Sequence, residues 1–149
     1  MKVRRIHSEL RETVATYDAR SPLNRPGVLA ALFRSTGMGD SPTEQFWIIA
    51  LDARYRPIGI LRASEGTATS TLVHPREVFG PAIRLGAVSV AVAHNHPSGD
   101  ATPSEEDIEL TQRLIDAGKL LGVPLLEHVV LGEGEAYYSI RSNSRRLSF

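Results

Sequence analysis

The sequence predicts a single α/β domain, and three observations support this prediction. The chain has 149 residues, of which 42% are hydrophobic and 23% charged, so its length supports one hydrophobic core and makes two domains a poor expectation. Segments with helical periodicity alternate along it with short β-rich segments, an order typical of α/β proteins. One of the β-rich segments is almost wholly apolar and ends directly on a histidine. We therefore expect polar chemistry at the end of a buried strand.

The first half of the chain contains two predicted helices with a predicted strand pair between them. Residues 26–37 have Pro near the start, apolar residues at helical spacing and Gly at the end, which predicts a helix. Residues 46–52 and 58–64 are β-rich runs on either side of a polar turn, which predicts two paired strands. Residues 75–86 begin with Pro and end with Gly, so we predict a second helix despite its internal Gly-Pro pair.

The second half begins with the apolar strand. Residues 87–93 are short, β-branched and almost wholly apolar, as expected of a strand buried on both faces. Residues 105–122 place leucines and an alanine in one helical stripe and end on Gly, which predicts a long helix. Residues 124–132 and 135–141 predict two closing strands. The polar and basic residues 141–149 predict a loose tail.

Charge and composition exclude several classes of function. The 17 basic and 17 acidic side chains cancel, so no global electrostatic attraction favours nucleic acid or an anionic membrane. The sequence has no cysteine, which excludes disulfides and thiolate metal ligands. The N-terminus is charged throughout and no apolar run approaches the ~18 residues of a membrane span. We therefore expect a soluble, cytoplasmic protein without strong nucleic-acid or membrane binding.

A polar loop, 94-HNHPSGDATPSEED-107, joins the apolar strand to the long helix. His94 and His96 are two residues apart, so in an extended segment both imidazoles project to the same side. Ser104 is the expected N-cap of the helix, and Asp107 falls at the third helical position beside it. Two imidazoles, one carboxylate and one open position form the ligand set that a catalytic zinc prefers.

Each part of this pattern also has a purely structural explanation. Ser104 and Asp107 alone match an ordinary helix start, and a lone His-x-His pair is more often found on a surface or in a core than on a metal. The combination favours the metal site, because both histidines follow a hydrophobic strand and the Ser-x-x-Asp sequence comes eight residues later.

The loop resembles the JAMM (MPN-type) metalloprotease signature, His-x-His followed by Ser-x-x-Asp. Its fuller form, His-Asn-His-Pro-Ser-Gly-Asp, resembles the RadC branch of that superfamily, although Ala101 stands where the family commonly has Pro. Three further segments resemble RadC segments in the same order: 44–52, 72–83 and 114–132. The resemblance predicts a RadC-like domain over residues 40–141, preceded by an N-terminal extension and helix over 1–39 and followed by a polar C-terminal tail over 142–149.

The resemblance also implies a fold, an activity and a set of site residues. The implied fold is like that of cytidine deaminases, a mixed sheet with helices on both faces. The implied activity is zinc-dependent cleavage of a peptide or isopeptide bond. His94, His96 and Asp107 would bind the Zn²⁺ ion with a water in the fourth position, Glu44 would act as general base and acid, and Ser104 would help to stabilise the oxyanion. A peptide or protein, ubiquitin-like proteins among the candidates, is the expected substrate.

Other acids and histidines compete for these roles. Glu65 and Glu77 are the rival acids, although the helix dipole is enough to explain Glu77 in a first helical turn. His128 lies in an apolar strand, where a core histidine or one that supports a metal ligand is expected rather than a ligand. His74 is expected in the turn before its helix and His7 in an exposed N-terminus.

Three alternative functions are weighed against the hydrolase. A zinc deaminase is disfavoured, because its Pro-Cys-x-x-Cys ligands need cysteine. An HNH nuclease is suggested only by the letters of the tripeptide, since the residues of that family are dispersed over a longer unit. A non-catalytic interaction module for DNA repair or mobile elements is disfavoured by the neutral charge and by the intact set of Glu, His, His, Ser and Asp.

Overall fold

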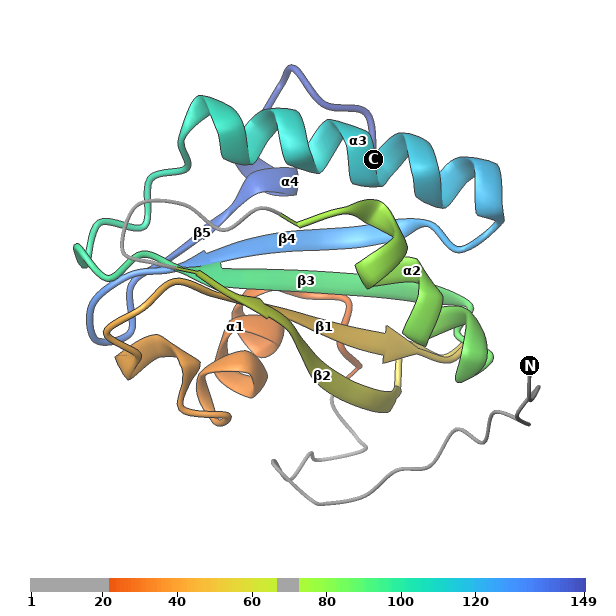
Figure 1. Ribbon diagram of the computed structural model, residues 1–149, viewed down its shortest axis with the longest axis horizontal. Coiled ribbons are helices and arrows are strands. Elements are labelled where there is room, and N and C mark those ends of the chain that lie inside the picture. The colour runs from red at the N-terminus through yellow and green to blue at the C-terminus, as the bar shows by residue number, and fades with distance from the viewer. Residues whose placement is uncertain (1–21, 67–72) are drawn as a thin grey trace, which may run out of the picture.

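A computed structural model of the protein describes residues 22–66 and 73–149. Within these residues five strands form one sheet in the order β2-β1-β3-β4-β5 (Figure 1). The strands are β1 (Gln45–Leu51), β2 (Pro57–Glu65), β3 (Ser89–Asn95), β4 (Leu125–Leu131) and β5 (Tyr137–Ser139). In this described sheet β3 and β4 run parallel, and the other neighbouring strands are antiparallel. The expected mixed sheet is confirmed, whereas His7 and the rest of residues 1–21 lie outside the described part of the chain.

Helices cover both faces of this sheet. They are α1 (Pro26–Arg34), α2 (Pro75–Arg84), α3 (Glu105–Leu121) and the short α4 (Ile140–Asn143), with a 3-10 turn, η1, at Met38–Asp40. Figure 1 shows α2 and α3 over one face and α1 against the other. The core therefore has two parts, one containing Ile48, Phe79 and Leu114 and the other Phe33 and Ile49. In the described ranges, no helix is both long and apolar enough to cross a membrane.

The central strand β3 brings the polar loop to the edge of the core. All seven of its residues are buried, which confirms the prediction of a strand covered on both faces. It begins at Ser89 rather than residue 87 and continues through Asn95, because His94 is paired with Phe46 of β1 on one side and with Val130 of β4 on the other. His94 is thus part of the sheet rather than of the loop.

The helix boundaries follow the sequence signals closely. Helix α1 has Pro26 in its first turn and ends at Arg34, three residues before Gly37, which adopts the left-handed φ of 86°. The side chain of Ser104 caps the N-terminus of α3 as predicted, and Gly122 ends that helix with a φ of 73°. Such positive φ values favour glycine because it has no Cβ atom.

The predicted closing strand over residues 135–141 is too long at both ends, because β5 covers only Tyr137–Ser139. Strand β5 ends at Ser139, and the chain turns into α4 because the Ser139 hydroxyl accepts a hydrogen bond from Ser142 N over 3.0 Å. The buried carboxylate of Glu127 holds the corner, accepting hydrogen bonds from Ser139 Oγ at 2.8 Å and from Arg141 N at 3.2 Å. These contacts come from β4 and cannot be inferred from the local pattern.

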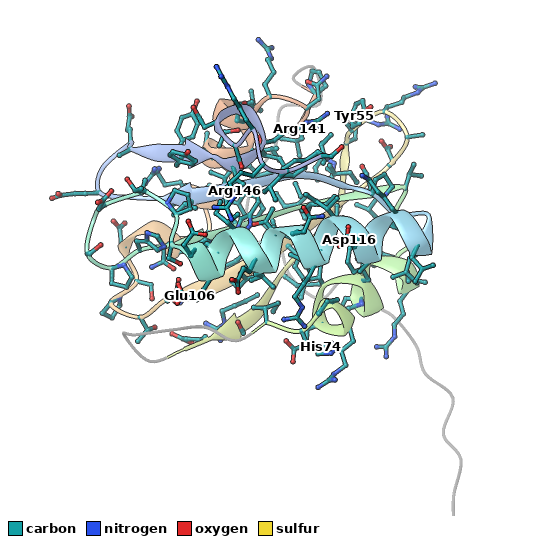
Figure 2. All side chains as sticks on the ribbon, turned by 90° about the horizontal axis from the view of Figure 1, so that it is seen from above. Tyr55, His74, Glu106, Asp116, Arg141 and Arg146 are labelled. Carbon is teal, nitrogen blue, oxygen red and sulfur yellow. The ribbon has the colours of Figure 1, made fainter. Side chains whose placement is uncertain are left out.

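The C-terminal residues are packed against the domain, so the expectation of a loose tail is also wrong. Leu147 and Phe149 contact the core part beneath α2 and α3. Arg146 lies beside α3 (Figure 2) and its Nη1 atom reaches both carboxylate oxygens of Glu105 at 2.9 and 3.0 Å. Lys119 Nζ donates to the carbonyl of Ser148 over 2.6 Å. Two apolar side chains within the basic sequence thus anchor the tail along α3.

Candidate metal centre

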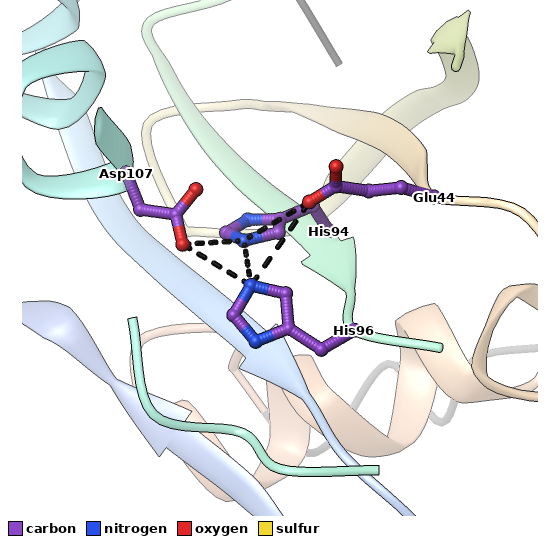
Figure 3. A group of neighbouring side chains, drawn as sticks. All are labelled: Glu44, His94, His96 and Asp107. Carbon is purple, nitrogen blue, oxygen red and sulfur yellow. Dashed lines mark hydrogen bonds and ion pairs between the residues drawn. The ribbon is translucent and has the colours of Figure 1, made fainter. Parts of the chain in front are cut away.

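Four predicted side chains meet where β3 ends and α3 begins. Figure 3 shows His94 and His96 from the β3 end, Asp107 from the first turn of α3 and Glu44 from the loop before β1, all pointing toward one another. One ligand atom from each residue can be chosen so that all four atoms lie within 4.8 Å of one another. The sheet register explains the meeting, because antiparallel pairing sets Phe46, two residues after Glu44, opposite His94.

Three of these atoms form a nearly equilateral triangle. The Nε2 atoms of His94 and His96 are 3.0 Å apart, and they lie 3.2 and 3.1 Å, respectively, from Oδ2 of Asp107. Ligand atoms that surround a tetrahedral zinc at about 2.0–2.1 Å lie about 3.3–3.4 Å from one another. The triangle therefore fits one zinc ion after only a small expansion, and its two imidazoles and one carboxylate are the appropriate chemical groups.

Local hydrogen bonds fix two of the three candidate ligands, His96 and Asp107, in place. His96 Nδ1 is 2.8 Å from the carbonyl oxygen of Asp100, which can only accept a hydrogen bond, so the Nδ1 atom donates. Asp107 Oδ2 also accepts from the backbone nitrogen of Ser104 over 2.9 Å, and Ser104 Oγ accepts from Asp107 N over 3.2 Å. The hydrogen bonds that cap the helix are thus the same ones that hold the candidate ligand Asp107.

The charges of the triangle favour a cation. Burial opposes ionisation of Asp107, yet hydrogen bonds from His94 and His96 hold the pKa of its carboxyl group well below the ordinary value. The hydrogen bond to the Asp107 carboxylate raises the pKa of His96, against the opposing effect of burial. The carboxylate is therefore anionic, and protons compete with a metal ion for the neighbouring imidazole.

Glu44 lies farther from the histidines than Asp107 does. Its Oε1 atom is 3.7 Å from His94 Nε2 and 4.0 Å from His96 Nε2, and its side chain is 14% exposed. These distances are longer than the sides of the triangle. Glu44 is therefore placed to contact a molecule bound at the triangle, and it is also one of the four residues that could hold a metal ion.

Asn95 is a site residue that the sequence reasoning missed. Its buried side chain faces away from the two histidines that flank it: Oδ1 accepts from Gln45 N over 2.7 Å, and Nδ2 donates to the carbonyls of Thr43 and Ser41 over 3.1 and 3.3 Å. These hydrogen bonds hold the backbone on both sides of Glu44. The strand alternation that places two histidines together predicts that the intervening residue faces the opposite way, and this signal could have identified it.

The rival acids have other partners. Glu65 accepts hydrogen bonds from Thr43 Oγ1 at 2.7 Å and Gln45 Nε2 at 3.3 Å. Glu77 accepts from the backbone nitrogen of His74 over 2.9 Å at the start of α2, as expected of a carboxylate in a capping position. Neither belongs to the four-residue cluster.

His128 is fully buried behind the ligand triangle. Its Nε2 atom is 2.8 Å from His94 Nδ1, and its Nδ1 atom is 2.6 Å from Thr111 Oγ1. Burial lowers the pKa of His128 well below its ordinary value, so the ring is neutral. This position agrees with the expectation of a core histidine, or one that supports a metal ligand, rather than a ligand.

The chain is similar to a known protein family and to proteins of several organisms. Residues 23–145 match the family described as RadC-like JAB domain. A UPF0758 protein of Symbiobacterium thermophilum is 50% identical over 109 residues, which cover 73% of this chain and 46% of that protein. A UPF0758 protein of Acaryochloris marina is 45% identical over 122 residues, covering 82% of this chain and 49% of the relative.

A third relative extends the similarity over more of the chain. A UPF0758 protein of Rubrobacter xylanophilus is 41% identical over 133 residues, which cover 89% of this chain and 57% of that protein. The chain thus spans about half the length of the curated relatives it matches. The family match covers the whole sheet and all four residues of the cluster, and the chain belongs to the RadC-like JAB domain family.

Proposed function

We propose that this domain is a zinc-dependent hydrolase that cleaves a peptide or isopeptide bond. The observation that carries the proposal is the triangle of His94, His96 and Asp107, with the Glu44 carboxylate beside it. A triangle of two imidazoles and one carboxylate leaves a fourth tetrahedral position for a small molecule, which is the arrangement of catalytic rather than structural zinc sites.

The ion and Glu44 have separate tasks in this proposal. When bound, zinc would supply Lewis acidity, which lowers the pKa of water towards ~7 and polarises a carbonyl group. The Glu44 carboxylate takes the proton of the attacking water and later gives it to the leaving amine. Its distances from the two Nε2 atoms support this role, because a proton acceptor must lie near the attacking group without occupying a ligand position.

Ser104 is placed to interact with the carbonyl oxygen of the substrate. Its Oγ atom already accepts a hydrogen bond from Asp107 N, and a hydroxyl group has one proton to donate in addition. The residue is exposed at the rim of the site. We propose that the hydroxyl donates to the developing oxyanion.

The exposed rim favours a chain-like substrate. Pro97, Ser98, Asp100, Thr102 and Ser104 are all exposed along the loop between β3 and α3. A peptide or a protein tail can reach such a site from solvent, and a ubiquitin-like protein is one partner of this kind. The balanced charge of the chain disfavours strong nucleic-acid binding.

The test is a cleavage screen with a broad set of peptides and isopeptide-linked substrates. Purified protein with measured zinc content should cleave members of the set, lose this activity after chelation and regain it when zinc is restored. Glu44→Gln with full zinc should be inactive. Cleavage that survives removal of the metal would contradict the proposal. No cleavage by zinc-loaded protein, together with a tight and steeply salt-dependent complex with duplex DNA, would instead favour an interaction module.

A further inference from the structure

A chain of hydrogen bonds runs from one side of the candidate metal centre to the other through the core. It begins at His94 Nδ1, passes over 2.8 Å to His128 Nε2, and continues from His128 Nδ1 over 2.6 Å to Thr111 Oγ1. It ends where Thr111 Oγ1 lies 2.6 Å from the backbone carbonyl of Asp107. His128 and Thr111 are fully buried and His94 is 2% exposed, so solvent does not determine how this chain is protonated.

The last contact determines the direction of the whole chain. The Asp107 carbonyl oxygen can only accept, so the single hydroxyl proton of Thr111 points at it. Thr111 Oγ1 then has only lone pairs to offer His128, and the proton between them belongs to His128 Nδ1. A neutral imidazole carries one such proton, which leaves His128 Nε2 as an acceptor.

His94 must then donate to His128. The His94 Nδ1 atom therefore carries the proton of this hydrogen bond, and Nε2 is the ring atom left to face the ligand triangle. The reversed chain would need the Thr111 proton to point at His128, which would leave two oxygens facing each other at 2.6 Å without a proton between them.

We propose that His128 and Thr111 are positioning residues that fix the tautomer of His94 in which Nε2 can bind a metal. His96 has the same tautomer through a direct contact, because its Nδ1 atom donates to the backbone carbonyl of Asp100. His94 lies inside the sheet, where a second histidine and a threonine replace that loop carbonyl. The hydrogen-bond partner of a metal-binding histidine commonly sets its tautomer and basicity.

The same series of hydrogen bonds also connects two candidate ligands that come from different secondary-structure elements. Thr111 lies one helical turn after Asp107 on α3, and His128 lies on β4 next to β3. These hydrogen bonds therefore link the candidate ligand His94 on β3 to the backbone of the candidate ligand Asp107 on α3. This inference rests on the proposed metal site and not on hydrolysis, so it can be tested without a substrate.

The experiment uses the whole chain labelled with ¹⁵N at histidine and compares Thr111→Val with Thr111→Ser. Long-range ¹H–¹⁵N spectra of metal-free protein at pH 8 report which ring nitrogen carries the proton. The wild type should show Nδ1–H at both His94 and His128. Thr111→Val should move the His128 proton toward Nε2 and weaken zinc binding about 10–100-fold in a chelator competition. Thr111→Ser, which keeps the hydroxyl, should restore both readouts.

A matched control separates positioning from general loss of stability. Ser139→Ala also removes a buried hydroxyl that donates a hydrogen bond, in this case to Glu127. It should lower stability while leaving the His94 tautomer and zinc affinity unchanged. Absence of a proton from His94 Nδ1 in the metal-free wild type would overturn the inference, and so would zinc binding by Thr111→Val as tight as that of the wild type. Failure of the wild type to bind zinc would overturn the proposed function as well.

Discussion

Asn95 accepts a hydrogen bond from the backbone nitrogen of Gln45 over 2.7 Å, joining the end of β3 to the residue that follows Glu44. The same side chain donates to the carbonyls of Ser41 and Thr43. One buried amide, whose side chain faces away from His94 and His96, therefore fixes the loop that carries the proposed proton acceptor.

Asn95→Ala is expected to separate the position of Glu44 from metal binding. The change leaves one backbone donor and two carbonyls without this partner, which should lower the free energy of unfolding by about 1–3 kcal/mol in urea titrations. Zinc should remain bound, because His94, His96 and Asp107 are unchanged, while the rate of hydrolysis falls. Loss of zinc in parallel with activity would show that Asn95 supports the ligands instead.

Removal of any ligand is expected to empty the site. His94→Ala, His96→Ala and Asp107→Ala should each lose zinc after gel filtration, since three ligands are the minimum of such sites. Elemental analysis of the purified proteins measures the metal content. His74→Ala is the matched histidine control, because His74 caps α2 and lies outside the cluster, and it should keep one zinc per chain. Stoichiometric zinc in all three ligand variants would refute the assignment.

Glu44→Gln is expected to preserve structure and abolish turnover. The amide has nearly the same shape and cannot accept the proton, and a positioned acid/base contributes ~10²–10⁴-fold to rate. Zinc content and stability should stay near those of the wild type. Glu65→Gln is the control, since Glu65 is bound by Thr43 and Gln45 outside the cluster, and it should remain active. The reverse result would assign the proton transfer to Glu65.

Ser104→Ala should lower the rate less than Glu44→Gln does, but it should also lower the free energy of unfolding. Loss of one oxyanion donor lowers kcat roughly 10²–10³-fold, and loss of the cap costs about 1 kcal/mol. Ser104→Gly removes the same hydroxyl but weakens the cap by only a few tenths of a kcal/mol. Equal losses of kcat in both variants, with unequal unfolding free energies, would attribute the rate effect to the hydroxyl. If kcat instead decreases in step with the unfolding free energy, the role of Ser104 is limited to capping the helix.

Glu127 is expected to make stability depend on pH. Burial raises the pKa of its carboxyl group above the ordinary value of 4.5, despite hydrogen bonds from Ser139, Arg141 and His128. The folded state then holds the proton more tightly than the unfolded state, so the wild type should lose stability as pH rises from 4.5 through the raised pKa.

Glu127→Gln removes this titration and keeps a side chain that can still pair with Ser139. Its unfolding free energy relative to the wild type should therefore increase over that interval and stay constant at higher pH. Urea titrations of both proteins across the acid range measure the difference. A difference that does not change with pH would show that Glu127 has an ordinary pKa in the folded protein.

The sequence predicts best what depends on short spacings. His94 and His96 share one side because of strand alternation, and Asp107 joins them because Ser104 starts the helix. Glu44 is different, because only the pairing of β1 with β3 brings it to the site, and the family resemblance rather than spacing indicated it. Strand alternation predicts which way Asn95 faces, but its partners depend on sheet register and those of Thr111 on the placement of α3, so their roles do not follow from spacing.

The errors in the fold have the same origin. The local pattern over residues 135–141 favours a strand, and nothing nearby reveals that Glu127 ends it at Ser139. The basic character of the tail likewise hides Leu147 and Phe149, whose packing depends on a core built from the sheet together with α2 and α3.

The three ligand atoms of the triangle all come from residues 94–107, whereas Glu44 comes from a distant part of the chain. A bound ion would therefore cross-link the two ends of one short loop between β3 and α3. Closing a short loop removes little chain entropy, so most of the domain does not need the ion in order to fold. Departure of the metal would release the loop and the first turn of α3, detected as faster amide hydrogen exchange there, while the sheet that holds Glu44 stays protected.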